Sequence, residues 1–183
     1  NMRNDQLDAA FALMQCGLSD EGLRKAKAII DLETILGEIE KKDGGERFPR
    51  DSGLYFFTVF GTPGGSQPWS WRVEGHHLSL HFLVANLVNI AYTPSFFGSN
   101  PAEVKIGPEK GLRILRAEED LGIQLFLSLN QTQRKQATIY SDAPADIITR
   151  AGRKVDITLQ EGLPAATMSS IQMEKLFDLI KVF

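Results

Sequence analysis

The sequence contains a single cysteine, Cys16, so an internal disulfide and a cysteine-based zinc site are both excluded. It lacks an excess of one charge as well, because 20 Lys and Arg residues oppose 23 Asp and Glu residues. A chain so close to neutral has little electrostatic attraction for nucleic acids, and we predict no nucleic-acid partner. The most apolar run, residues 78–92, is shorter than the roughly 20 residues of a membrane-spanning helix. The first residues lack the apolar core of a signal peptide, so we expect a soluble chain and assign it no compartment.

Two familiar catalytic motifs are missing too. The glycine-rich stretch 61–65 has no lysine, which excludes a phosphate-binding P-loop there. No Gly-x-Ser-x-Gly elbow occurs, so a serine hydrolase of that type is excluded. Any chemistry must therefore come from other residue types.

What is present predicts an α+β fold in one domain over residues 1–183. Helical spacing of apolar residues predicts an N-terminal helical hairpin over 5–42. Aromatic and β-branched runs predict a small antiparallel β-sheet over 53–92, with strands at 54–60, through 69–74 and 76–84, and near 88–92. A loop over 93–108 precedes C-terminal helices over 109–183, the first of which should begin at Glu109. A short β run is expected at 155–159.

Two later helices have capping-box signatures at their starts. Asn130 with Gln133, and Ser169 with Gln172, have the spacing at which a cap and the third helical residue exchange hydrogen bonds. The sequence therefore predicts helix starts at both places.

The most unusual feature is that all three histidines, His76, His77 and His81, lie within six residues. On one continuous strand, His77 and His81 share a face with Ser79, while His76 shares the other face with leucines. The Cα atoms of His77 and His81 would be about 13 Å apart, too far for both to bind one metal ion. His76 fits either a core histidine with backbone partners or a metal ligand.

Aromatic residues around these histidines predict a ligand pocket. On the strand pattern, His77 and Ser79 share a face with Trp69 and Trp71, a mixture typical of a pocket floor. The loop over 93–108 adds Phe96, which either plugs the edge of the core or walls the pocket. We predict a small-molecule pocket with these lining residues: Trp69, Trp71, Ser79, Phe96 and Asn100.

An acidic triplet, Glu118, Glu119 and Asp120, lies on the helix predicted from residue 109. Glu118 and Asp120 fit a solvated face, on which Arg116 and Asp120 form an i,i+4 pair. Glu119 differs because it falls on the apolar stripe of that helix with Leu115. A carboxylate on an inner face requires a partner, such as a histidine or a metal ion. Glu119, and secondarily Glu118, are therefore the candidate catalytic residues.

Five ordered stretches resemble the bacterial family known as domain of unknown function 3500; they span 54–63, 69–80, 94–102, 111–120 and 143–147. In that family's pattern the position of His81 usually carries Asn, which weakens His81 as a ligand. The resemblance also implies that family members continue beyond the position of Phe183, with an Asn-His-x-His stretch in the later segment. We therefore expect this chain to be part of a longer protein, with part of any composite site lying in that segment.

Two functions fit these residues. The first is a metal-dependent enzyme, a hydrolase or an oxidoreductase, in which His76 or His77 binds a divalent metal such as Zn²⁺ or Fe²⁺. Glu119 or Glu118 would then be a further ligand or the general base. The second is a non-catalytic domain that binds a ligand or partner, with structural histidines. The residues slightly favour the enzyme and leave the reaction, the metal and the oligomeric state open.

Overall fold

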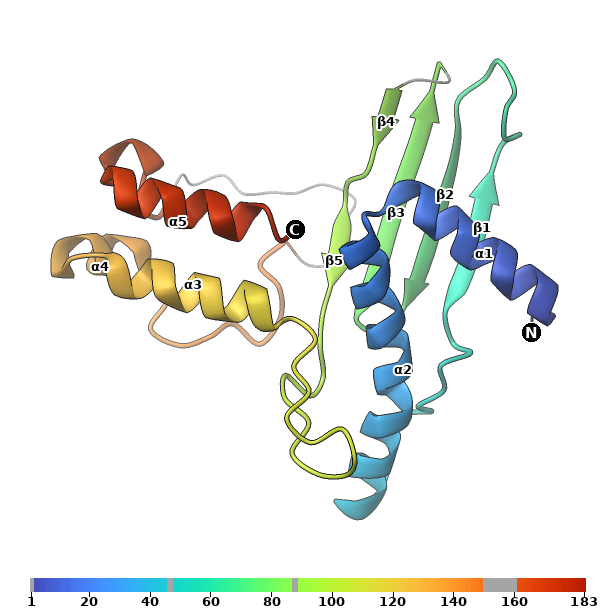
Figure 1. The fold of residues 1–183 in the computed structure, drawn as a ribbon, viewed down its shortest axis with the longest axis horizontal. Coiled ribbons are helices and arrows are strands. Elements are labelled where there is room, and N and C mark those ends of the chain that lie inside the picture. The colour runs from blue at the N-terminus through green and yellow to red at the C-terminus, as the bar shows by residue number, and fades with distance from the viewer. Residues whose placement is uncertain (1, 46–47, 87–88, 150–160) are drawn as a thin grey trace. The chain divides into compact units, whose positions relative to one another are not determined.

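The computed structural model describes residues 2–45, 48–86, 89–149 and 161–183. It divides into two compact units, Asn1–Leu115 and Arg116–Phe183. Within the described residues, five α-helices and one small antiparallel sheet confirm the predicted α+β class (Figure 1). The expectation of a single domain over 1–183 stays a prediction.

The first unit begins with the two predicted helices, α1 (Asn4–Gly17) and α2 (Asp20–Lys42). Ser19 caps α2, since its Oγ accepts a hydrogen bond from the Gly22 N–H at 3.0 Å. Acidic residues in the first turn of α2 and lysines in its last turn match the helix dipole. The cap and the dipole together explain why α2 begins and ends where it does.

Five strands form the sheet: β1 (Phe56–Phe60), β2 (Trp69–Gly75), β3 (Leu78–Ala85), β4 (Asn89–Ala91) and β5 (Ser95–Phe97). All pairs are antiparallel, in the order β1-β2-β3-β4, and β5 also pairs with β3. Helices α1 and α2 cross one face of this sheet (Figure 1). The other face of β2 and β3 carries polar side chains.

The sequence-based strand through 69–74 and 76–84 is wrong, because the chain reverses at His76 and His77. Gly75 of β2 pairs with Leu78 of β3, which leaves those two histidines as the turn of a β-hairpin. His77, the second turn residue, adopts the left-handed conformation with φ 61°, as the second central residue of a type II turn does. A residue with a positive φ is uncommon outside glycine. The sequence signal for the reversal is a change of phase, because the apolar positions are odd in β2 and even in β3.

This reversal also changes which residues share a face. Trp71 lies opposite Phe82 in the pairing of β2 with β3, and their rings stack at 4.2 Å in the core against the helices. Ser79 lies opposite Glu74, and His81 opposite Arg72, on the other face. The expected common face of Ser79 with Trp71 is therefore wrong, because a two-residue turn sets a different register from an unbroken strand.

The second unit contains α3 (Arg116–Ser128), α4 (Gln131–Ala137), the 3₁₀ turn η1 (Ala165–Thr167) and α5 (Ser170–Ile180). Both predicted capping boxes are present, at Asn130 and at Ser169. Helix α3 begins at Arg116 rather than at Glu109, because the preceding residues form turns that include Gly111 with φ 92°. The β run expected at 155–159 lies outside the described residues.

Across the part of the chain that the structure describes, no helix is both long and apolar enough to cross a membrane.

Candidate functional site

Helix α2 carries a buried carboxylate, Glu33, on the side that packs against the sheet. The residue is 5% exposed and has Ile29, Ile30, Leu32 and Leu36 as buried companions on the same helix. A carboxylate in such surroundings needs a charged or hydrogen-bonding partner, because burial removes its hydration. The hairpin turn between β2 and β3 supplies one.

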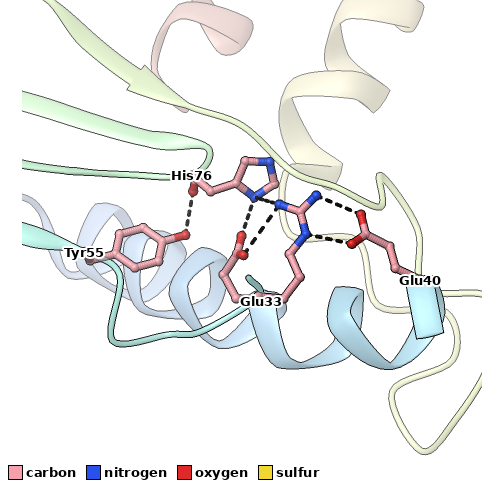
Figure 2. Close-up of polar contacts among 5 residues, drawn as sticks. Glu33, Glu40, Tyr55 and His76 are labelled. Atoms are coloured by element: carbon pink, nitrogen blue, oxygen red, sulfur yellow. Dashed lines mark hydrogen bonds and ion pairs between the residues drawn. The ribbon is translucent and has the colours of Figure 1, made fainter. Parts of the chain in front are cut away.

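That partner is His76, whose Nδ1 contacts Glu33 Oε1 (Figure 2). Arg50 Nη1 also lies 3.3 Å from His76 Nδ1. A guanidinium can only donate hydrogen bonds and an ionised carboxylate can only accept them. Nδ1 cannot satisfy both partners, and its contact with Glu33 is the shorter one, so we assign a proton to His76 Nδ1, donated to Glu33. The other ring nitrogen, Nε2, points away from Glu33.

Arg50 holds this carboxylate from the other side. Its Nε and Nη2 bind both oxygens of Glu40, at 2.9 Å and 2.7 Å, and its Nη1 lies 3.9 Å from Glu33 Oε2. The side chain of Arg50 is 9% exposed, so the guanidinium sits between two carboxylates with little access to water. Bidentate arginine–carboxylate pairs of this kind have fixed geometry. Glu33 is thereby held in one place, and it holds the imidazole of His76 in turn.

Tyr55 holds the backbone of the same turn. Its hydroxyl donates a hydrogen bond to the carbonyl oxygen of His76 at 2.5 Å (Figure 2). Burial, followed by the negative charge of Glu33, raises the pKa of Tyr55, while Arg50 opposes the shift. The phenol therefore remains protonated and a donor at neutral pH, and both the ring and the backbone of His76 are positioned.

His77 occupies the second turn position, with its ring centroid 4.0 Å from that of His76. Its carbonyl accepts the N–H of Gly98 at 2.7 Å, which ties the turn to the segment after β5. Burial, the neighbouring His76 and Arg50 lower the pKa of His77 to about 4, so its ring is neutral at pH 7. Its Nδ1 is buried and has no hydrogen-bond partner among the described residues.

The structure brings together some predicted site residues and separates others. His76 and His77 are adjacent, and Phe96 lies beside His77 with a ring separation of 6.5 Å. Trp71 is in the core against Phe82, and Trp69 is half-buried on the same face of the sheet.

The other two predicted pocket residues are Asn100 and Ser79. Asn100 is exposed in the loop after β5. Ser79 Oγ lies 3.2 Å from His81 Nε2, and that nitrogen is 3.3 Å from Glu74 Oε1. Ser79 and His81 thus form a polar cluster with Glu74 on the open face of the sheet, and Ser79 lies opposite Phe96 in the pairing of β3 with β5.

Glu118 and Glu119 lie in the first turn of α3, in the second unit. The expectation that Glu119 is on an inner face is wrong: Glu119 is exposed, and so are Ile123 and Phe126 of the same stripe. Apolar spacing identifies residues that share a face of a helix, but it does not say which face packs.

Sequence reasoning missed Glu33, Glu40, Arg50 and Tyr55. A usable signal existed for Glu33, because it follows Ile29 by four residues on an apolar helical stripe. Like Glu119, Glu33 falls on an apolar helical stripe, where a carboxylate requires a partner, and Glu33 is buried. Arg50 and Tyr55 gave no such signal, since both lie outside helices and their contacts join distant parts of the chain.

The cluster offers two kinds of chemistry. With Nδ1–H on Glu33, Nε2 of a neutral His76 has a free lone pair that can bind a metal ion or accept a proton. Among the described residues, no group of three or more His, Cys, Asp and Glu side chains is arranged to hold a metal ion. A metal bound at His76 therefore needs ligands beyond this cluster.

A family model described as "Protein of unknown function (DUF3500)" matches residues 1–183 of the chain. The comparisons with curated proteins and with solved structures gave no match.

Proposed function

The chain belongs to the family described as "Protein of unknown function (DUF3500)", and we propose that it is a metal-dependent enzyme, a hydrolase or an oxidoreductase. In this proposal, His76 binds a divalent metal ion, Zn²⁺ or Fe²⁺, through Nε2. His77 provides a second imidazole, and the remaining ligands and the general base come from residues outside this cluster.

The observation that carries the proposal is the contact between Glu33 and His76 Nδ1. Histidines that bind metals usually donate their second ring N–H to a carboxylate or carbonyl, which orients the ring and makes the ligating nitrogen more basic. Here the orienting carboxylate is itself held by Arg50, which is fixed by Glu40. This much buried charge around one partly exposed imidazole is costly for a turn that serves packing alone.

His77 supports the same proposal. Because its pKa is about 4, the ring is neutral at pH 7 and needs no deprotonation before it binds a metal. An imidazole beside His76 suits borderline metals such as Zn²⁺ and Fe²⁺. The substrate would be a small molecule that binds next to Phe96.

Metal analysis tests the proposal directly. The purified chain, loaded with Zn²⁺ or Fe²⁺ and desalted, should retain about one metal ion per chain, and a His76→Ala/His77→Ala variant should retain far less. Glu33→Gln should weaken metal binding by about 10–100-fold, because it removes the orienting carboxylate. His81→Ala is the matched control and should bind as the native chain does. Sub-stoichiometric metal in both the native chain and the double variant would contradict the proposal.

A second candidate, a non-catalytic binding domain with structural histidines, is favoured by one observation. Both turn carbonyls are used: His76 accepts from Tyr55, and His77 accepts from Gly98. For such a domain, a chelator at neutral pH should leave the unfolding midpoint unchanged. A metal centre predicts a lower midpoint after chelation, so one unfolding experiment separates the two candidates.

A further inference from the structure

Strand β1 forms one edge of the sheet. It pairs with β2 on one side and with no other strand among the described residues. Its sequence, Phe-Phe-Thr-Val-Phe, has no charge and no proline, although proteins usually protect edge strands with lysines, prolines or bulges. Phe56 is 62% exposed, and Val59 and Phe60 are also exposed. An edge of this kind is an open template for another strand.

Helix α1 extends past this edge. A Cβ atom on Gly17 would lie 2.7 Å from Phe82 of β3 and 2.9 Å from Trp71 of β2, so the end of α1 lies over the middle of the sheet. Six residues earlier, Phe11 contacts Phe57 of β1, with ring centroids 6.3 Å apart. Six helical residues span about 9 Å, or about two strand spacings. Every three residues of α1 therefore advance the helix across the sheet by about the width of one strand.

The start of α1 lies where a further strand would be. Leu7 continues the stripe of Phe11 and Met14, which belong to the core or pack against it, but it is 38% exposed. It precedes Phe11 by one helical turn, about 6 Å, which places it about one strand spacing beyond β1. In Figure 1 the N-terminal end of α1 extends past β1 accordingly. Leu7 thus extends the packing stripe of α1 beyond the last strand of the sheet.

The strand is also complementary to itself. In an antiparallel pair centred on Thr58, each Phe56 lies opposite the other Phe60, and each Phe57 lies opposite the other Val59. Phenylalanine would face phenylalanine on the open face of the sheet, and apolar residues would meet on the helix face. Thr58 would lie opposite its own copy. No charged residue of the strand opposes this pairing or favours a charged partner instead.

We propose that the edge of β1 pairs with the same edge of a second copy of this chain, antiparallel and centred on Thr58. The two sheets become continuous, and Leu7 of each copy packs on β1 of the other. The pairing uses the same patch on both copies, so it closes as a two-fold dimer. At the far edge of the sheet, β4 and β5 have three residues each, which makes them poor templates for continued growth. This interface is independent of the metal centre proposed above.

Analytical ultracentrifugation of the whole 183-residue chain tests the interface. We expect a monomer–dimer equilibrium, with Thr58→Glu raising the dimer dissociation constant at least about tenfold by placing two carboxylates face to face. The fold should tolerate this change, because Thr58 lies opposite Arg72 of β2 and the new carboxylate gains a cation within its own chain. Thr62→Glu, in the loop after β1, is the control with the same added charge and should dimerise normally.

Mixing tests the register. Thr58→Lys should also be a monomer, and an equimolar mixture with Thr58→Glu should restore the dimer, because opposite charges then meet at the two-fold axis. Leu7→Gln tests the interface in a second way, because it leaves the sequence of β1 unchanged. It should weaken the dimer about fivefold or more without lowering the unfolding midpoint of the monomer. A native chain that stays monomeric up to about 100 μM, a dimer unaffected by Thr58→Glu and Leu7→Gln, or folded Thr58 variants that do not pair would each overturn the proposal.

Discussion

At the scale of single residues, the hairpin turn between β2 and β3 depends on close contacts among a few groups that have no room to move. Gly75 precedes the turn, and a Cβ atom there would lie 2.3 Å from Cδ1 and 2.6 Å from Cε1 of Tyr55. The Tyr55 ring is buried and cannot move away without losing its hydrogen bond to His76. The turn therefore depends on the absence of a side chain at Gly75.

This closeness predicts that Gly75→Ala is destabilising, by about 2–3 kcal/mol, because the added methyl group overpacks the Tyr55 site. Urea unfolding measures the effect. The matched control is Gly122→Ala in α3, where a Cβ atom would meet nothing within 4 Å. That substitution should be neutral or stabilising by up to about 1 kcal/mol, since alanine favours helices. Equal effects at the two glycines would contradict this account of the turn.

His77 predicts a dependence of stability on pH. Its pKa is about 4 in the folded chain, against 6.5 for an ordinary histidine. Between these two pH values the unfolded chain binds more protons than the folded chain. The contribution of His77 to the free energy of unfolding is therefore fully retained above about pH 6.5 and is lost as the pH falls toward 4. Allowing for partial solvent screening, the loss is about 1–2 kcal/mol.

His77→Asn tests this dependence, because asparagine does not titrate and tolerates the positive φ of the turn. The variant should lose less stability between neutral pH and about pH 4 than the native chain does, as measured by urea unfolding at each pH. His81→Asn, on the open face of the sheet, is the control and should keep the contribution of His77. If His77→Asn and the native chain lose stability in parallel, protonation of His77 does not explain the acid sensitivity.

At the scale of elements, α2 is the scaffold of the polar cluster, since it carries both Glu33 and Glu40. Its N-terminal cap is a single side chain, Ser19. Ser19→Ala should destabilise the chain by about 1 kcal/mol because it leaves a helix N–H without its acceptor. Thermal unfolding measures this loss, and Ser66→Ala in the exposed β1–β2 loop should cost less than half as much. An unchanged midpoint for Ser19→Ala would show that the cap does not limit the stability of α2.

Elements that repeat a simple pattern could be predicted, and those that depend on one backbone angle could not. The stripe through Ile29 and Leu32 predicts α2, and the aromatic run predicts β1. The turn at His76 and His77 was missed although the apolar residues change from odd positions (Trp71, Val73) to even positions (Leu78, Leu80) across it. That change of phase indicates a break in the strand, but the reversal itself depends on the positive φ of His77.

Only part of the candidate site could be predicted from the sequence, for a related reason. His76 and His77 stood out by composition, and Glu33 could have been found on its apolar stripe. The contact of Arg50 with Glu40 and Glu33 joins the segment before β1 to α2, and such long-range pairing leaves no local signature. The charge that completes the cluster is therefore visible only in the folded chain.

At the scale of the whole molecule, the two units differ in how much apolar surface they bury. The hydrophobic core draws all its members from the first unit, from Met14 on α1 to Ile114 near the unit boundary. In the second unit, Leu129 and Gln172 are the only buried residues among those described. Hydrophobic burial is the main favourable term in folding, so the two units should differ in their ability to fold alone.

This difference predicts the behaviour of two fragments. A fragment of residues 1–115 should unfold cooperatively in urea, because it retains every residue of the core. A fragment of residues 116–183 should show little structure by circular dichroism, because helices without a buried face are marginal in water. Mixing the fragments adds a control, since a gain in helical signal would show that the first unit supplies the missing contacts. Cooperative unfolding of the isolated 116–183 fragment would contradict the prediction and would make the second unit an independent domain.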